Sequence, residues 1–176
     1  MTRFNFAKKH QGKGFRLEVG SVDPPVVDPS PPLVGESCTL STAVLGFAAG
    51  VDVTFRVFEP HALHLDPVVE LTGQTQEADR LVEVTWTFDW EAHRDQLSAA
   101  RFVCVARCGD LAAISDPFEF KQRLGATIED ERGTPLPHVT VRLSPARGAP
   151  FEVETDEDGK IDALVPPGAY RIAAEL

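Results

Sequence analysis

The fold is decided by the stretch Leu124-Gly-Ala-Thr-Ile-Glu-Asp-Glu-Arg-Gly-Thr-Pro-Leu-Pro-His-Val-Thr-Val-Arg-Leu143, with Thr155-Asp-Glu-Asp-Gly-Lys-Ile161 and Val165-Pro-Pro-Gly-Ala-Tyr-Arg-Ile172 following it. Apolar residues alternate with polar ones through these segments, and a period of two indicates half-buried β-strands. The alternating apolar positions are Ile128, Val139, Val141, Leu143, Ile161, Tyr170 and Ile172.

Turn-forming residues close each of these strands. They are Asp130-Glu-Arg-Gly133, Asp156-Glu-Asp-Gly159 and Pro166-Pro-Gly168. Asp caps backbone donors in such turns, and Gly supplies a positive φ. Turns this close together leave room only for short antiparallel strands. Residues 122–176 are therefore predicted to form a small β-sandwich, an architecture that does not by itself name an activity.

A second set of strands is predicted in residues 33–121. Val51–Glu59 and Leu81–Trp90 show the clearest alternation of apolar and polar residues, and Glu91–Leu97 is expected to form a helical turn. Six or seven strands in about 90 residues indicate an immunoglobulin-like sandwich. The other expected strands are Glu36–Leu45, Pro67–Thr72, Ala100–Arg107 and Ala113–Lys121, and the expected core residues are Val53, Phe55, Val84, Trp86, Phe102 and Cys104.

Residues 1–32 differ from the rest in composition. Phe15-Arg-Leu-Glu-Val19 alternates as an isolated strand would, and Asp23–Pro32 holds five of the 14 prolines, which predicts a stiff, extended linker. This arm is the expected docking element, with Phe15, Leu17 and Val19 as partner-binding residues in β-strand addition. Pairing of the arm with its own sandwich is the alternative.

Charge and composition exclude several classes of protein. The formal net charge of −10 argues against nucleic-acid binding, because phosphate contacts need clustered Lys and Arg. The start of the sequence lacks the apolar core of a signal peptide, and no apolar run reaches the ~20 residues that span a bilayer. We expect a cytoplasmic protein without membrane contact, with delivery outside by a secretion apparatus as the alternative route.

The C-terminal segment resembles the carboxypeptidase-regulatory-like, or transthyretin-like, β-sandwich. The matching motifs are Ile128–Leu136, Val139–Leu143, Thr155-Asp156 with Gly159, and Pro167–Tyr170. The segment is short for that family, which leaves a terminal strand missing or supplied by another region. The predicted fold class is thus all-β: two tandem sandwiches, immunoglobulin-like and then transthyretin-like, with an extended N-terminal arm.

The whole chain also resembles bacterial proteins encoded near type VI secretion spike genes. The motifs concerned are Gly50–Glu59, Val82–Phe88, Arg101–Arg107 and Ser115–Phe120. This resemblance implies a non-enzymatic adaptor that links a secretion spike protein to an effector, with self-association as a further possibility. The alternatives are a surface- or ligand-binding module, such as an adhesin or virion decoration, and a transthyretin-like hydrolase.

Catalytic and metal sites are not expected. Hydroxyisourate hydrolases of the transthyretin-like fold end in Tyr-Arg-Gly-Ser, whereas this sequence has Tyr170-Arg-Ile-Ala, so only two of the four residues match. Related intradiol dioxygenases need two Tyr on iron, and this chain has one Tyr. His61, His64 and Asp66 are too few for a metal centre without a further ligand, and Asp156 with Asp158 is expected to form a hairpin turn rather than a calcium loop.

The three cysteines are expected to be reduced. Cys38 and Cys104 lie on strands that suit the inter-sheet disulfide of immunoglobulin domains. Without a secretion signal, however, buried free thiols are the expected state. Cys108 has no neighbouring His in the sequence that would activate it as a nucleophile. No cofactor is predicted.

Overall fold

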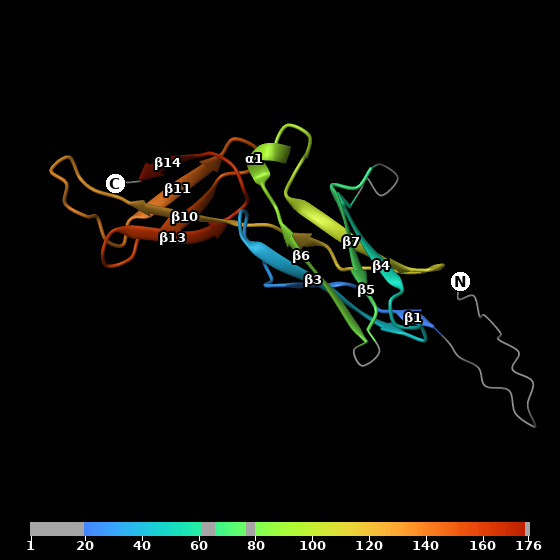
Figure 1. Cartoon of the computed structure of the whole chain (residues 1–176). Helices are drawn as coiled ribbons and strands as arrows, with labels where there is room; N and C mark the ends of the chain where they lie inside the picture. Colours follow the sequence, from blue (N-terminus) through green and yellow to red (C-terminus); the bar gives the residue numbers. More distant parts are fainter. Residues whose placement is uncertain (1–19, 61–65, 77–79, 175–176) are drawn as a thin grey trace, which may run out of the picture. The chain divides into compact units, whose positions relative to one another are not determined.

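The computed structural model describes residues 20–60, 66–76 and 80–174, and these form two compact units. The first unit comprises residues 20–30, Ser37–Trp86 and Arg101–Phe118, and the second comprises Pro31–Glu36, Thr87–Ala100 and Glu119–Leu176. Strands dominate both units, and the one described α-helix has four residues (Figure 1). The fold is all-β and sandwich-like, as the alternation predicts.

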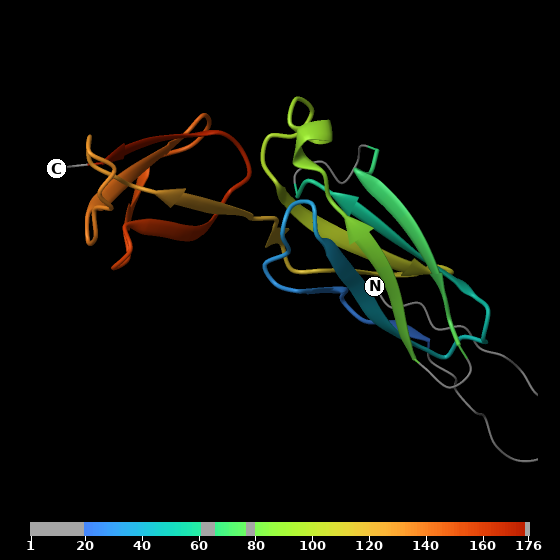
Figure 2. The same ribbon diagram turned by 60° about the vertical axis from the view of Figure 1, so that its left-hand side comes forward.

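In the first unit, two antiparallel sheets enclose the core, and the sheets are seen from a second direction in Figure 2. One sheet has the order β5-β4-β7-β8, with β9 also paired to β7. In the other, β3 pairs with β1, β2 and β6. The strands are β1 (Ser21–Val22), β2 (Val26–Asp28), β3 (Ser37–Leu45), β4 (Asp52–Phe58), β5 (Val69–Gln74), β6 (Leu81–Thr87), β7 (Arg101–Cys108), β8 (Leu111–Ile114) and β9 (Phe118–Glu119).

The predicted core of this sandwich is confirmed. Val53, Phe55, Phe102 and Cys104 are fully buried, and the rings of Trp86 and Phe102 meet edge-on with centroids 5.7 Å apart. Val84 is half-buried. The apolar residues at alternate positions of each strand therefore point to the same face of their sheet, and the two apolar faces pack against each other.

Three expected boundaries change. Leu81–Trp90 is not one strand, because β6 ends at Thr87 and Trp90 begins helix α1 (Trp90–His93), whose first turn is capped by Asp89. Ala113–Lys121 is interrupted around Asp116-Pro117, which separates β8 from β9. The Pro-rich stretch, predicted to be a linker, contributes β2 to the sheet through pairs such as Val27 with Leu40.

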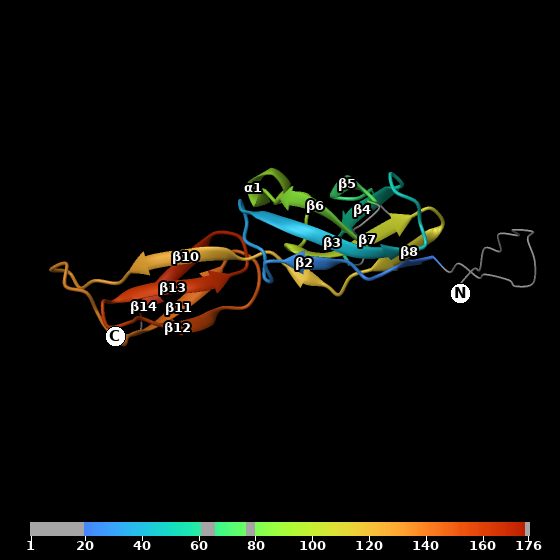
Figure 3. The same cartoon turned by 60° about the horizontal axis from the view of Figure 1, so that its bottom comes forward.

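The second unit contains a smaller sandwich of a two-stranded and a three-stranded sheet. Figure 3 shows β11, β12 and β14 as neighbouring strands. Its core consists of Val141, Leu143, Ile161 and Val165. The strands are β10 (Gln122–Thr127), β11 (Thr140–Pro145), β12 (Phe151–Glu154), β13 (Lys160–Val165) and β14 (Tyr170–Ala174), with β10 paired to β13 and β11 between β12 and β14.

The predicted turns of this sandwich are confirmed. The carboxylate of Asp156 accepts from the backbone N–H groups of Asp158 and Lys160, and Gly159 has φ +70°. The carboxylate of Asp130 likewise accepts from Thr134 and Arg132, and these bonds lower the pKa of Asp130.

Buried Thr155 ties the loop before β11 to the core. Its hydroxyl donates to Leu136 O at 2.7 Å and accepts from the N–H of Val139 at 3.0 Å. A buried polar side chain is stabilising only when its hydrogen bonds are made, and here both are.

Candidate functional site

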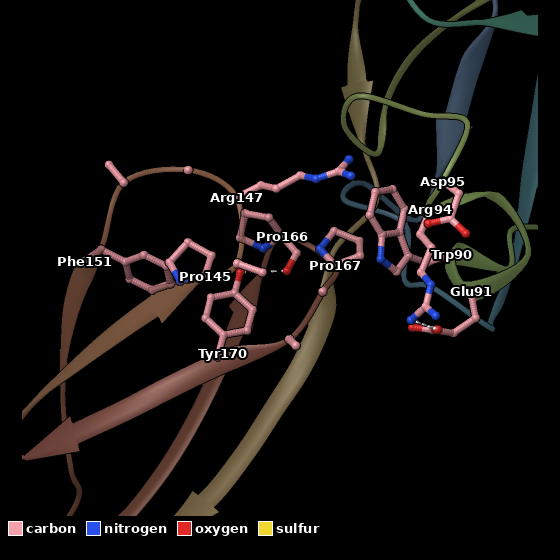
Figure 4. A pocket seen from close by; sticks show the side chains of 15 residues that line it. Trp90, Glu91, Arg94, Asp95, Pro145, Arg147, Phe151, Pro166, Pro167 and Tyr170 are labelled. Atoms are coloured by element: carbon pink, nitrogen blue, oxygen red, sulfur yellow. Dashed lines mark hydrogen bonds and ion pairs between the residues drawn. The ribbon is translucent and has the colours of Figure 1, made fainter.

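The second unit holds a cavity of about 360 Å³, which falls within the size range of ligand pockets. Its 15 lining residues all belong to the second unit. They come from α1 and the residues after it, from the stretch between the last residue of β11 and the first of β12, and from the stretch between β13 and the first residue of β14. Rings make up much of its wall (Figure 4). These are Trp90, Pro145, Phe151, Pro166, Pro167 and Tyr170.

Tyr170 is fixed on the cavity wall as the first residue of β14. Its hydroxyl donates to Pro166 O at 2.7 Å, and its ring meets that of Phe151 edge-on, with centroids 6.0 Å apart. Burial raises the pKa of Tyr170, so the phenol stays protonated near neutral pH and remains a donor. This tyrosine therefore holds its own loop in place.

Gln122 fixes the same loop from the start of β10. Its side-chain amide donates to Gly168 O at 2.7 Å and accepts from Gly168 N–H at 3.1 Å. Gly168 has φ +141°, a conformation that side chains strongly disfavour. The wall of the cavity is thus held by side-chain and backbone bonds together.

Charged residues lie at the α1 side of the cavity. Arg94 and Glu91 form an exposed ion pair at 2.7 Å, which Figure 4 marks with a dashed line. The guanidinium of Arg147 makes a long contact of 3.5 Å to Leu97 O. Exposed pairs contribute at most about 1 kcal/mol to stability, so these side chains can exchange partners when a ligand enters.

The second feature is the open edge of β14. Among the described strands, β14 pairs with β11 alone, and its residues from Arg171 to Ala174 are exposed. Ile172 lies opposite Leu143 in the register with β11. Directly opposed residues of an antiparallel pair share one face, and Leu143 is fully buried in the core, yet Ile172 is 41% exposed. At Ile172 the core-facing side of this strand is therefore uncovered.

The sequence-predicted partner-binding residues Phe15, Leu17 and Val19 lie outside the described residues. So do His61 and His64, while Asp66 is exposed. Within the described part of the chain, no three His, Cys, Asp or Glu side chains gather to hold a metal ion. His93 belongs to α1 and stacks on Phe88, with ring centroids 5.8 Å apart.

The cysteines are buried on strands of the first sandwich. Burial raises the pKa of Cys38 to about 11 and that of Cys104 to about 12, the nearby Cys38 thiol adding to the effect on Cys104. Burial also raises the pKa of Cys108. Thiols held protonated in this way are poor nucleophiles.

Sequence reasoning missed both features of the second unit. The alternation predicts Trp90 in a strand, and it does not indicate the position of this residue beside Pro145 and Pro167. The same alternation predicts that Ile172 is half-buried, whereas it is exposed. Alternation within one strand gives no signal for the open edge.

No protein-family model matches this sequence, and no curated protein matches it. Within the described residues, no helix has the length and apolar character needed to cross a membrane. One similar solved structure is described as the crystal structure of a tetra-tandem repeat in the extending region of a large adhesion protein. The match has a TM-score of 0.45 and 12% identity, and it covers 89% of this chain and 49% of that chain. This chain therefore spans about half the length of that structure.

Proposed function

We propose that this protein is a non-enzymatic adaptor that binds other proteins through the edges and ends of its β-sandwiches. The observation that carries the proposal is the edge of β14, where Ile172 lies on the core-facing side and is nevertheless exposed. An open edge accepts a further strand through main-chain hydrogen bonds, and an exposed apolar side chain helps to fix the register of the added strand.

The finer assignment rests on the resemblance in sequence. On this basis the first sandwich is immunoglobulin-like, the second is transthyretin-like, and the protein joins the spike of a bacterial type VI-like contractile apparatus to its cargo. It works from the cytoplasm, it needs neither cofactor nor metal, and its partners are proteins rather than nucleic acid or membrane. The raised pKa values of the buried thiols and the structural hydrogen bond of Tyr170 support a non-enzymatic role.

The test is affinity purification of the full chain from its native host, followed by mass spectrometry. Ile172→Asp serves as the edge variant, and Arg132→Glu, which alters an exposed turn residue, is the matched surface control. We expect spike or effector proteins with the wild type and the control, and their loss with Ile172→Asp. Equal recovery of spike or effector proteins with the wild type and both variants would contradict the adaptor role. So would the absence of spike and effector proteins from all three samples.

The ring-lined cavity favours a second candidate, a ligand-binding module. Trp90, Phe151 and Tyr170 offer apolar faces next to exposed charges, a combination typical of small-ligand sites. Chemical-shift mapping of the folded protein against a panel of short Pro-rich peptides and oligosaccharides tests this candidate. Shifts confined to the cavity residues would favour it, and an unchanged spectrum would remove those ligand classes.

A further inference from the structure

Among the described strands, none pairs with the outer edge of β14. The three-stranded sheet of β12, β11 and β14 faces a sheet in which, among the described strands, only β10 and β13 are paired. Tyr170 packs against the core, but Ile172 is not part of it and remains 41% exposed. A strand that adds to the free edge of β14 would continue the sheet and shield Ile172.

The edge also carries a charge on its outer side. Arg171 points to the opposite face from Ile172 because successive residues of a strand alternate. It is exposed, and it makes no ion pair within the described residues. An added strand that suits this edge needs apolar residues at alternate positions and a negative charge opposite Arg171.

The sequence of the chain contains a segment with this pattern outside the described residues. Phe15-Arg-Leu-Glu-Val19 has three apolar residues at alternate positions, separated by one basic and one acidic residue. Antiparallel pairing with Leu17 opposite Ile172 places Glu18 opposite Arg171 and Phe15 opposite the small Ala174. The same register places Arg16 opposite Ala173 and Val19 opposite Tyr170.

The charges distinguish the two directions of pairing. In the antiparallel register Glu18 meets Arg171, whereas parallel pairing with Leu17 opposite Ile172 sets Arg16 against Arg171. Opposite charges across a strand pair are stabilising, and like charges are destabilising. Charge complementarity therefore selects the antiparallel arrangement.

A second copy of the chain is the occupant that this proposal names, because every copy carries both the segment and the complementary edge. Pairing within one chain is the alternative, and the mixing experiment separates it from pairing between copies.

We propose that residues Phe15–Val19 of one copy add antiparallel to β14 of a second copy, with Leu17 beside Ile172 and Glu18 beside Arg171. This inference rests on the proposed function, since it names a partner for the same edge. Each copy has one such segment and one such edge, so two copies can exchange segments reciprocally.

Charge reversal in the full chain tests the proposal. Sedimentation equilibrium of the wild type should show a mass that rises with concentration above that of the 19.2 kDa monomer. Glu18→Arg and Arg171→Glu should each weaken association about three- to tenfold, because each replaces an attractive pair with a repulsive one. Arg132→Glu, the matched control, should leave association unchanged.

An equimolar mixture of the two single variants is the decisive sample. Two copies of the same variant place like charges opposite each other at both contacts. A dimer of one copy of each variant instead has one Glu–Arg pair at each contact, so the mixture should associate as tightly as the wild type. Exchange of the backbone amides of residues 170–174 should slow in the mixture and not in either variant alone.

Three outcomes would overturn the proposal. They are a wild type that stays monomeric, single variants that associate like the control, and a mixture no tighter than its components. Restoration in the double variant without restoration on mixing would show pairing within one chain. A monomeric protein that still captures a spike or effector through Ile172 would end this inference and keep the proposed function.

Discussion

Gly159 closes the turn between β12 and β13, and replacing it with Ala tests the packing of the second sandwich. The residue has φ +70°, and an added Cβ would lie 2.8 Å from Leu136 N, 2.9 Å from Pro135 Cβ and 3.0 Å from Ile128 O. Two of these atoms belong to the backbone and take part in the hydrogen bond from Leu136 N–H to Ile128 O. They cannot move away as the end of a flexible side chain would.

The expected loss of stability has two parts. The left-handed conformation costs an Ala residue about 1–2 kcal/mol. Displacing the Ile128–Leu136 backbone should weaken one or two hydrogen bonds at roughly 1 kcal/mol each. Gly159→Ala should therefore destabilise the second unit by about 3 kcal/mol.

Gly133→Ala is the matched control, because Gly133 has φ +79° and the nearest atom to an added Cβ is Glu129 Oε2 at 4.0 Å. It should cost only the conformational part, about 1–2 kcal/mol. Urea denaturation with pulsed hydrogen exchange, read on peptides from β11 and β13, measures the second unit separately. Equal losses in the two variants would show that the turn does not pack against Leu136 as described.

Three further predictions concern the first sandwich. Trp86→Ala should destabilise it by about 3–5 kcal/mol in chemical denaturation, because the indole is 7% exposed, and a change below about 1 kcal/mol would show that the ring is not in the core. All three thiols should be free in the native protein and react slowly with iodoacetamide until the protein unfolds; a linked Cys38–Cys104 peptide would contradict this. Since burial raises the folded pKa values of Cys38 and Cys104 above the ordinary thiol value of 9.0, the stabilisation from the protonated thiols is complete below pH 9 and is lost as pH rises toward 11–12. Cys104→Ala should flatten this alkaline decline, and an unchanged slope would refute the assignment.

The sequence predicts the strands well where the chain alternates without interruption. β4 and β7 are found almost as expected, because rows such as Val53, Phe55 and Val57 each face one buried layer. The turns at Asp130 and Asp156 also follow from local chemistry, since Asp and Gly specify them within four residues.

Strand boundaries that depend on competing local interactions are harder to predict from the sequence. Phe88 and Trp90 continue the parity of β6, but the carboxylate of Asp89 accepts from Glu91 N–H and Ala92 N–H and begins a helix instead. Val26 and Val27 form a strand despite the prolines around them. Proline is compatible with an edge strand, because no ladder hydrogen bond is required on the open side.

The candidate sites depend on tertiary pairing that one sequence does not specify. The cavity combines Trp90 with Pro145 and Tyr170, which are far apart in the chain. Alternation correctly assigns Ile172 to the core-facing side of β14. Its exposure follows from which strands lie beside and opposite it, and single-strand periodicity contains no information on that point.

The most direct test of the central claim is amide hydrogen exchange of β14 in the assembled protein. Exchange of residues 170–174 is compared between the complex purified from the host and the dilute, isolated full chain, with β5 (Val69–Gln74) as an internal reference. We predict at least about tenfold slower exchange in β14 and no change in β5, because an added strand would occupy the free backbone groups of the β14 edge. Protection elsewhere, with residues 170–174 exchanging as in the isolated chain, would contradict binding at this edge.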